Sequence, residues 1–393
     1  MGMSNVLFLG MPSHGHVNPT LGLVHELTRQ GEKVSYFASE LFRAKIEAAG
    51  AMFFSYSEDL DIFKAGGKPG HGGGLLSVIS KAPSVIADIL AQTAGIKFDY
   101  LIHSAAFPFT GAMVQLLNIP SVSSLAVFAG LDRFKDVANF KLPEEVNQNY
   151  ERVANQLRIT YGITMPGNPL ELMLYPSPLK LVYTSRYFAP PSAYLDETCR
   201  FVGPPVFARQ ENLDFPFERL ENKRVLYISL GTVFGVFDTR LYNLFAETFA
   251  DWDGIVVMAA HGVDLGEKHF PEHFIVRDYL PQNALLKYTD VAITHAGMNS
   301  MSDLISNEVP FVSLPLGADQ PLLAARAAEL GATITLDIQQ LNPENLKTAV
   351  NDVLTDPAYL AAIRKINASF KSAGGYPKAV ADIFEFKKKH SIT

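Results

Sequence analysis

Short runs of β-branched and aromatic residues alternate with helical patterns along almost the whole chain. Residues 6–9 predict a buried strand, and the spacing of apolar residues over 17–27 predicts a helix that ends at Gly31. Residues 34–38 then predict the next strand. Strands that alternate with helices in this way form parallel sheets with helices on both faces. We therefore expect a doubly wound α/β protein.

The same pattern begins again at residue 225, after Gly203-Pro204-Pro205 and a polar stretch over 209–223. Prolines and polar residues of this kind are typical of a linker between domains. A chain of 393 residues is also longer than one core usually accommodates. We predict two Rossmann-like domains, 1–205 and 206–393, that face each other across a cleft, with the final helix able to dock back on the first. Ligands are expected beyond the carboxyl ends of the strands.

Composition and charge narrow the class of function. The formal net charge of −7 argues against a nucleic-acid partner, and the short basic run 387–389 is interpreted as solvated. The single cysteine, Cys199, excludes an internal disulfide and indicates a reducing compartment. There is no basic leader and no apolar run of membrane-spanning length. We expect a cytoplasmic protein without a membrane span.

The most informative stretch is 291–300, where a strand is predicted to end at Thr294 and a helix to begin near Gly297. The first turn of a helix offers unpaired backbone N–H groups and the positive end of the helix dipole, both suited to a diphosphate. A glycine there lets a phosphate approach the backbone closely. The side chains that can add hydrogen bonds to such a ligand are His295, Asn299 and Ser300, with Asp303 placed for vicinal hydroxyls such as those of ribose.

Two further loops follow strands of the same predicted sheet. Ser229-Leu230-Gly231-Thr232 ends the first strand of the second domain, and Asp319-Gln320 follows the strand at 311–314. An adjacent carboxylate and amide can bind several sugar hydroxyls. Taken singly, each of these residues is also compatible with a helix cap or a solvated side chain. However, they gather at the ends of successive strands of one predicted sheet. Together they indicate a ligand that carries phosphate and sugar hydroxyl groups.

These motifs resemble the nucleotide-sugar signature of family-one UDP-glycosyltransferases, which have the two-domain GT-B fold. The bacterial members that glucosylate macrolides, flavonoids and other natural products are the most similar. The resemblance spans nearly the whole chain, in the right order and spacing. The matching motifs are Gly15-His16-Val17-Asn18-Pro19-Thr20-Leu21, Ser229-Leu230-Gly231-Thr232, Tyr279-Leu280-Pro281-Gln282, His295-Ala296-Gly297-Met298-Asn299-Ser300 and Asp319-Gln320.

The resemblance implies how a UDP-sugar is bound. The backbone at Leu280 would bind uracil and Tyr279 would flank the base, at a position where Trp is common. Asp303 stands where the family usually has Glu for the ribose hydroxyls, and the Asp319-Gln320 pair usually accompanies glucose. The predicted donor-binding residues are Ser229, Gly231, Thr232, Tyr279, Leu280, Gln282, His295, Gly297, Asn299, Ser300, Asp303, Asp319 and Gln320.

The catalytic residues are predicted from the loop after the first strand. An alcohol is a poor nucleophile at neutral pH, so its attack needs a nearby base with a pKa near 7, and histidine suits that task. The family places this base at the histidine before Val-Asn-Pro, which is His16 here, and His14 is interpreted as a polar loop residue. The resemblance implies inversion at the anomeric carbon, with the UDP-sugar as co-substrate and no metal or other cofactor.

One expected residue is missing. The family has a carboxylate that orients the histidine at the end of a strand near residue 100, typically in a Tyr-Asp pair, and here His103 and Ser104 hold those positions. Asp99 opens the strand, at its far end. Ser104 can accept a hydrogen bond from His16 but supplies no negative charge. Loss of the carboxylate costs about 10⁴ in the rate of a serine hydrolase triad, and we expect a smaller loss here and a preference for phenols, whose pKa is about 10.

The acceptor site and three alternatives stay open. Phe107, Phe109 and Phe128 are predicted to line an apolar acceptor pocket, but each is equally compatible with the core. A metal-dependent transferase would carry an Asp-x-Asp motif; triplets occur at 59–61 and 251–253, but neither follows a strand that ends at the predicted cleft. An epimerase would need carboxylates near the sugar, which the His16 loop lacks. The missing carboxylate suggests an auxiliary protein that binds a nucleotide sugar without transferring it.

Overall fold

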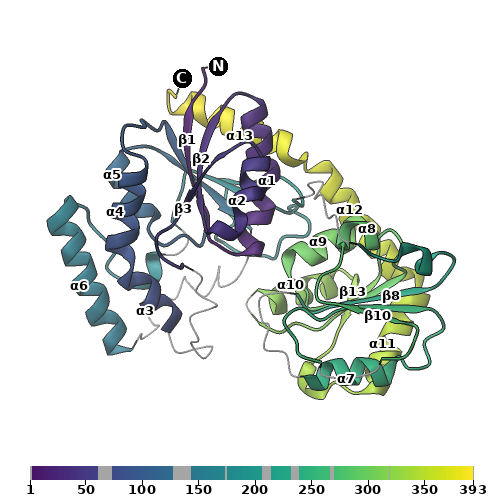
Figure 1. Ribbon diagram of the computed structural model, residues 1–393. Helices are drawn as coiled ribbons and strands as arrows, with labels where there is room; N and C mark the ends of the chain where they lie inside the picture. The colour runs from purple at the N-terminus through teal and green to yellow at the C-terminus, as the bar shows by residue number, and fades with distance from the viewer. Residues whose placement is uncertain are drawn as a thin grey trace. The chain divides into compact units, whose positions relative to one another are not determined.

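A computed structural model describes residues 2–60, 73–126, 143–172, 175–205, 214–231, 239–265, 270–317 and 319–392. The chain divides into two compact units (Figure 1). The first comprises Met1–Tyr183, Pro191–Phe207 and Gly374–Thr393, and the second comprises Thr184–Pro190 and Ala208–Ala373. The final helix belongs to the first unit, on which it was expected to be able to dock. The division at residue 205 differs in that a short segment before residue 191 belongs to the second unit.

The first unit contains a seven-stranded parallel sheet in the order β3-β2-β1-β4-β5-β6-β7. The order reverses at β1, which pairs with β2 on one side and with β4 on the other. The elements are β1 (Asn5–Leu9), α1 (His14–Arg29), β2 (Lys33–Ala38), η1 (Glu40–Phe42), α2 (Arg43–Ala48), β3 (Met52–Ser55), α3 (Gly73–Ser80), α4 (Ala82–Gln92), β4 (Tyr100–Ser104), α5 (Thr110–Leu117), β5 (Ser121–Leu125), α6 (Glu144–Tyr161), η3 (Pro169–Leu172), β6 (Leu179–Val182), β7 (Cys199–Phe201) and α13 (Gly375–Lys389).

The second unit contains a six-stranded parallel sheet in the order β10-β9-β8-β11-β12-β13. Its order reverses at β8, which lies between β9 and β11. The elements are η4 (Phe217–Leu220), β8 (Val225–Ser229), α7 (Thr239–Thr248), β9 (Ile255–Ala259), β10 (Phe274–Arg277), α8 (Gln282–Leu285), β11 (Val291–Thr294), α9 (Met298–Ser306), β12 (Phe311–Ser313), α10 (Gln320–Glu329), β13 (Thr333–Thr335), η5 (Ile338–Gln340), α11 (Pro343–Thr355) and α12 (Pro357–Ser372). The predicted pair of doubly wound α/β domains is confirmed.

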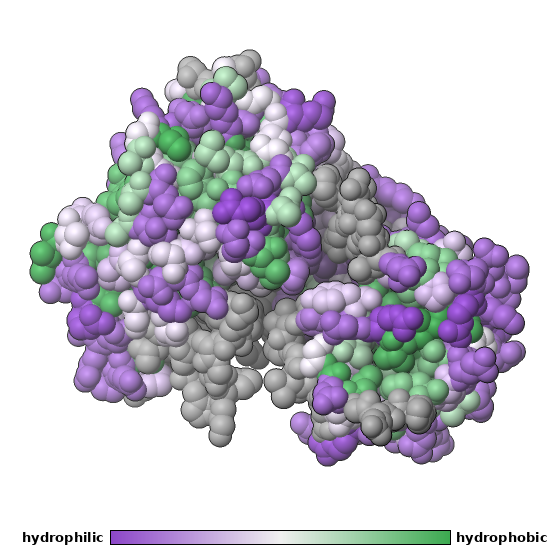
Figure 2. All heavy atoms as spheres, viewed as in Figure 1, coloured by the Kyte–Doolittle hydropathy of each residue, from purple (hydrophilic) through white to green (hydrophobic). Residues whose placement is uncertain are grey.

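Burial on both faces explains why the strands read as continuous apolar runs. In β1, Val6 and Phe8 belong to the core cluster on one face of the sheet, and Leu7 and Leu9 belong to the cluster on the other. A strand covered by helices on both faces has no solvated side and so no alternation of polar residues. Polar side chains occupy much of the outer surface instead, as Figure 2 shows for one face of the molecule. No helix in the described ranges combines the length and apolar character that a membrane span requires.

The carboxyl-terminal helix α13 packs against α1 of the first unit (Figure 1). The Tyr376 hydroxyl donates a hydrogen bond to the Pro19 carbonyl oxygen at 2.8 Å. The ring lies so close to Gly22 that a Cβ atom there would come within 2.1 Å of it. The last helix of the chain therefore helps to hold the helix that follows the first strand.

Lys387 of α13 is completely buried, so the prediction that the whole basic run 387–389 is solvated was wrong. Its ammonium forms an ion pair with Glu32 at 2.6 Å, and the Tyr100 hydroxyl donates to the second carboxylate oxygen at 2.8 Å. A buried charge requires such partners. Lys388, the next residue, is exposed, because adjacent positions of a helix point in different directions.

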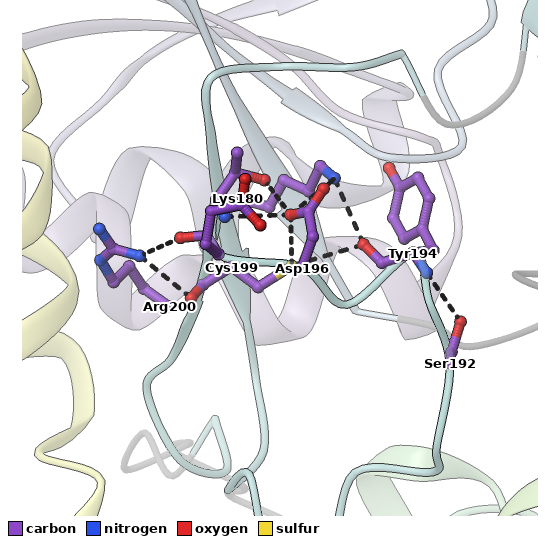
Figure 3. Close-up of polar contacts among 8 residues, drawn as sticks. Lys180, Ser192, Tyr194, Asp196, Cys199 and Arg200 are labelled. Atoms are coloured by element: carbon purple, nitrogen blue, oxygen red, sulfur yellow. Dashed lines mark hydrogen bonds and ion pairs between the residues drawn. The ribbon is translucent and has the colours of Figure 1, made fainter.

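A second buried lysine stabilises the edge of the sheet formed by β6 and β7 (Figure 3). The Lys180 ammonium lies 3.3 Å from both carboxylate oxygens of Asp196 and 3.3 Å from the Tyr194 carbonyl oxygen. Cys199, which pairs with Lys180 across the strands, donates from Sγ to the same carbonyl at 3.8 Å. The single cysteine is thus buried in a network that fastens the loop between the two strands.

The ion pair between Lys387 and Glu32 yields a prediction of stability. Lys387→Met should lower the free energy of unfolding by about 3–5 kcal/mol, because it leaves the Glu32 carboxylate buried without its cation. Lys388→Met, one residue away on the exposed side, should change it by less than about 0.5 kcal/mol. Urea denaturation of both variants is the measurement. Adding Glu32→Gln to Lys387→Met should recover part of the loss, and equal losses in the two single variants would contradict the assignment.

Candidate active site

His16 lies in the first turn of α1, and the strand pairing of the first unit brings it to Ser104. Strand β1, which precedes α1, pairs with β4 so that Leu9 lies opposite His103. Ser104 is the last residue of β4 and so lies at the same edge of the sheet as the start of α1. His16 Nδ1 is 3.0 Å from Ser104 Oγ, and both side chains are almost fully buried. The sequence-predicted hydrogen bond between these residues is present.

The Ser104 hydroxyl has a second partner, the backbone N–H of Ala106, which donates to Oγ at 3.3 Å. When Oγ accepts both N–H groups, His16 Nδ1 carries the proton and Nε2 has a lone pair. A hydroxyl can also donate to Nδ1, which a carboxylate cannot, and that arrangement would place the proton on Nε2. Ser104 therefore orients the imidazole ring but selects its tautomer less strictly than a carboxylate would.

Burial governs the protonation of His16. Desolvation lowers the pKa of its imidazole to about 4, so the ring is neutral at pH 7. A neutral ring is ready to accept a proton. However, the imidazolium that results gains no ionic partner from the Ser104 hydroxyl, so the proton is held weakly.

His103 in this strand and Asp99 just before it take structural roles. His103 is fully buried, with Nδ1 2.9 Å from the Ser104 carbonyl oxygen and Nε2 2.8 Å from Ser177 Oγ. Burial lowers its pKa to about 4, against a smaller opposite effect of the bond to the Ser104 carbonyl. Asp99 accepts a hydrogen bond from the Asn5 backbone N–H at 2.8 Å, which confirms that it lies at the other end of β4. Neither replaces the missing carboxylate.

The predicted acceptor residues pack in the core. Phe107 and Phe109 have no exposed surface, and their rings meet edge to face at 5.7 Å between centroids. The turn after β4 directs both rings into the cluster beneath α4 and α6, so they cannot line an open pocket as the sequence predicted. Tyr56 stacks on Phe107 in the same cluster. Phe128 lies outside the described residues.

In the second unit, His295 lies between two glycines. Strands β8 and β11 pair so that Ser229 lies opposite Thr294, and the loops that follow them meet. A Cβ atom at Gly231 would lie 2.5 Å from His295 Nε2, and one at Gly297 would lie 2.4 Å from the same atom. Gly231 also has a φ of +81°, which favours glycine. The imidazole therefore fits only because both neighbours lack a side chain.

Helix α9 begins directly after this histidine. Gly297 occupies the N-cap position without a side-chain hydrogen bond, so the first N–H groups of the helix have no cap from that residue. Asn299 and Ser300 lie in the first turn, and Asn299 Oδ1 is buried without a hydrogen-bond partner among the described residues. Burial lowers the pKa of His295 to about 4, against a smaller opposite effect of the Ser229 carbonyl, so the imidazole is a neutral donor at pH 7. This arrangement suits an anion such as a phosphate. Thr232 lies outside the described residues.

Tyr279 and His261 form an aromatic pair after strands β10 and β9, in which the tyrosine is exposed and the histidine is half-buried. Tyr279 is 50% exposed, which is high for a large ring, and its centroid lies 4.4 Å from that of His261. The Tyr279 hydroxyl lies 3.3 Å from His261 Nε2. Leu280 follows in the loop that leads to α8. The sequence did not indicate His261, because it shares no motif with Tyr279 and adjoins it only through strand pairing.

Hydrogen bonds join three polar residues on β8, α8 and α9. The Tyr227 hydroxyl donates to Gln282 Oε1 at 3.0 Å, and Gln282 Nε2 donates to Asp303 Oδ2 at 2.7 Å. Asp303 is 8% exposed. Two of the predicted donor residues are therefore in direct contact, and Tyr227 is a third member that sequence patterns gave no reason to select.

The remaining predicted pair lies at the start of α10. Asp319 is the N-cap residue and Gln320 the first residue of the helix, and both are largely buried. Gln320 Oε1 accepts hydrogen bonds from the backbone N–H groups of Leu316 and Gly317, at 2.8 and 3.1 Å. The glutamine thus fixes the shape of the loop after β12.

The described residues contain no group of three or more histidine, cysteine or carboxylate side chains that could hold a metal ion. Asp251 of the second Asp-x-Asp triplet pairs with Lys347 at 2.7 Å on the surface. The triplet at 59–61 extends beyond the described residues.

Known proteins are similar to this chain in sequence. Residues 209–373 match the sequence model of the family described as UDP-glucoronosyl and UDP-glucosyl transferase. The chain is 37% identical to the Uncharacterized UDP-glucosyltransferase YdhE of Bacillus subtilis (strain 168), over 94% of this chain and 95% of that protein. It is 28% identical to the NDP-glycosyltransferase YjiC of Bacillus licheniformis, over 98% of each.

Solved structures show the same fold. The glycotransferase of kitacinnamycin matches with a TM-score of 0.84 at 23% identity, over 98% of this chain and 99% of that one. CalG4, the calicheamicin glycosyltransferase, matches with a TM-score of 0.78 at 24% identity, over 99% of each chain. With a relative that is 37% identical over nearly the whole length, the chain belongs to the UDP-glycosyltransferase family of GT-B fold and is a glycosyltransferase.

Proposed function

We propose that this enzyme moves a sugar, with glucose preferred, from a UDP-sugar to a hydroxyl group of a small, largely apolar acceptor, with inversion at the anomeric carbon. The observation that carries the proposal is the contact between His16 Nδ1 and Ser104 Oγ. With the proton on Nδ1, the lone pair of Nε2 is available as a general base. The preference for glucose rests on the Asp319-Gln320 pair, by resemblance.

In the proposed step, the acceptor O–H proton passes to His16 Nε2 while the acceptor oxygen bonds to the anomeric carbon. The bond from that carbon to the diphosphate breaks on the opposite face, and UDP leaves with the electron pair. The first-turn N–H groups of α9 and the His295 imidazole would meet the charge that develops on the diphosphate. The proposal includes no metal or further cofactor, and the single cysteine supports a cytoplasmic location.

The names of relatives support the class of acceptor. One is the oleandomycin glycosyltransferase of Streptomyces antibioticus, 25% identical over 97% of this chain and 90% of that protein. We propose an acceptor of the same broad kind, such as a phenol, a flavonoid or a macrolide. Among these, phenols fit the neutral partner of His16 best, because they release their proton more easily than aliphatic alcohols.

Ser104 also favours a second candidate, a protein that binds a nucleotide sugar without transferring it. A base with a pKa of about 4 and no ionic partner is a weak catalyst. The retained histidine and the intact arrangement around His295 favour transfer. Incubation with UDP-glucose and a mixture of phenols separates the two, since binding of UDP-glucose without acceptor-dependent release of UDP would establish the second candidate.

Ser104→Asp should raise the pKa of His16, because a carboxylate beside Nδ1 stabilises the imidazolium. In the parent enzyme, kcat/KM should fall only as the pH drops towards about 4, where His16 becomes protonated. In the variant this fall should occur at higher pH, and turnover of aliphatic alcohols should rise. Ser104→Asn, which has nearly the size of aspartate but no charge, is the matched control. A pH profile that is the same in all three proteins would contradict this account of His16.

The parent enzyme should turn over a phenol faster than an aliphatic alcohol of similar size and hydrophobicity. A phenol loses its proton more readily than an aliphatic alcohol, so its attack needs a weaker base. This matters here because protonated His16 has no carboxylate beside it. Initial rates with saturating UDP-glucose provide the measurement. His16→Ala should lose most activity with both acceptors, and a His16→Ala protein as fast as its parent would end the proposal.

Gly231→Ala should weaken UDP binding by about tenfold or more, which corresponds to about 1.4 kcal/mol. The added methyl group would overlap His295 Nε2, and the left-handed backbone adds strain. Gly331→Ala is the matched control, because Gly331 also has a positive φ, of +75°, but a Cβ atom there would meet only Ala362 Cβ, at 3.8 Å, which is an ordinary contact. Calorimetric titration with UDP tests both variants. Equal binding by the two would show that the space beside His295 is not part of the site.

A further inference from the structure

Tyr227 is a buried tyrosine in the central strand of the second unit, and its hydroxyl donates a hydrogen bond to Gln282. Leu226 and Ile228, its neighbours on β8, belong to the core cluster on the other face of the sheet. Tyr227 therefore points to the opposite face, where it is 4% exposed and donates to Gln282 Oε1. Phenylalanine would pack at this position almost as well as tyrosine. The distinctive contribution of Tyr227 is therefore the hydrogen bond that its hydroxyl makes.

The direction of each hydrogen bond in the chain is fixed by chemistry. A carboxylate only accepts hydrogen bonds, so the Gln282 NH₂ group must face Asp303, at 2.7 Å. The amide oxygen then faces Tyr227, whose hydroxyl must donate. If the amide turned over, its oxygen would lie against the carboxylate and its NH₂ group against the phenol. Tyr227 thus holds Gln282 in the orientation that binds Asp303.

We propose that Tyr227 is a positioning residue that sets a preference for ribonucleoside over 2′-deoxyribonucleoside diphosphates, through Gln282 and Asp303. The inference rests on the proposed function, in which Asp303 accepts hydrogen bonds from the ribose hydroxyls of UDP. Aspartate is one methylene shorter than the glutamate usual in the family, so its reach depends on where the carboxylate is held. The bond to Oδ2 fixes the plane of the carboxylate and leaves it capacity for further hydrogen bonds.

A carboxylate held in place discriminates better than one that can move. When a 2′-deoxynucleotide binds, a fixed and largely buried carboxylate loses a hydroxyl donor and regains no water, which costs affinity. A carboxylate released from Gln282 can turn towards the remaining 3′-hydroxyl or towards solvent. Loss of the Tyr227 hydroxyl should therefore weaken UDP binding more than binding of 2′-deoxy-UDP.

The test is calorimetric titration of the full chain with UDP and with 2′-deoxy-UDP, before and after Tyr227→Phe. The parent should bind UDP about tenfold or more tightly than 2′-deoxy-UDP, and the variant should reduce this ratio to about threefold or less. Tyr242→Phe is the matched control, because Tyr242 is a buried tyrosine in the core cluster on the opposite face of the same sheet. It should leave the ratio unchanged. Gln282→Leu should reduce the ratio as Tyr227→Phe does, and it tests the chain independently if the tyrosine variant does not fold.

Several results would overturn the inference. A parent that binds UDP and 2′-deoxy-UDP equally, or variants at Tyr227 and Gln282 that keep the full ratio, would remove the role of Tyr227 and leave the proposed function standing. A ratio that falls equally in Tyr242→Phe would assign the effect to general loosening of the unit. A parent that binds neither nucleotide would overturn the proposed function itself, and this inference with it.

Discussion

The parallel pairing of the first strand of each unit with its fourth strand is the constraint on which the candidate site depends. In the first unit β1 pairs with β4, and in the second β8 pairs with β11. At these points the order of the strands reverses, so the loops that follow the two strands run in opposite directions and leave room between them. The contact of His16 with Ser104 and the nesting of His295 against Gly231 both arise there. A shift of β4 by one residue would turn the Ser104 side chain to the other face of its sheet, away from His16.

The first unit shows how the proposed catalytic pair is formed without charge. Ser104 occupies the position from which a carboxylate would orient the imidazole, and its hydroxyl meets Nδ1 and the Ala106 N–H together. Geometry is thus preserved while electrostatic support is lost. Because burial already disfavours the imidazolium, the strength of the base depends on the missing charge more than it would at the surface.

Residues that lie in continuous motifs could be predicted from the sequence, and residues that act through tertiary contacts could not. The strand ends and glycine-containing turns identified Gly231 and His295, because a turn after a strand leaves a local pattern, and the family resemblance of such motifs identified His16 and Ser104. The aromatic residues after β4 were ambiguous, since a phenylalanine in a pocket and one in the core look alike in a sequence.

Long-range partners leave no local signal at all. Tyr227 meets Gln282 across 55 residues, and Glu32 meets Lys387 across 355, so neither pairing has a sequence signature. The basic run at the end of the chain therefore looked like an ordinary solvated terminus. His261 was overlooked for the same reason, because its partner Tyr279 lies on the neighbouring strand.

The return of α13 to the first unit has a consequence for how the protein is made. Residues of this helix complete the core cluster that contains β1 and α1, with Tyr376 seated on Gly22 and Lys387 neutralised by Glu32. During synthesis the amino-terminal end of the first unit emerges first, yet the helix that completes its core follows the whole second unit in the sequence. The first unit therefore cannot finish folding ahead of the second, as a self-contained amino-terminal domain would.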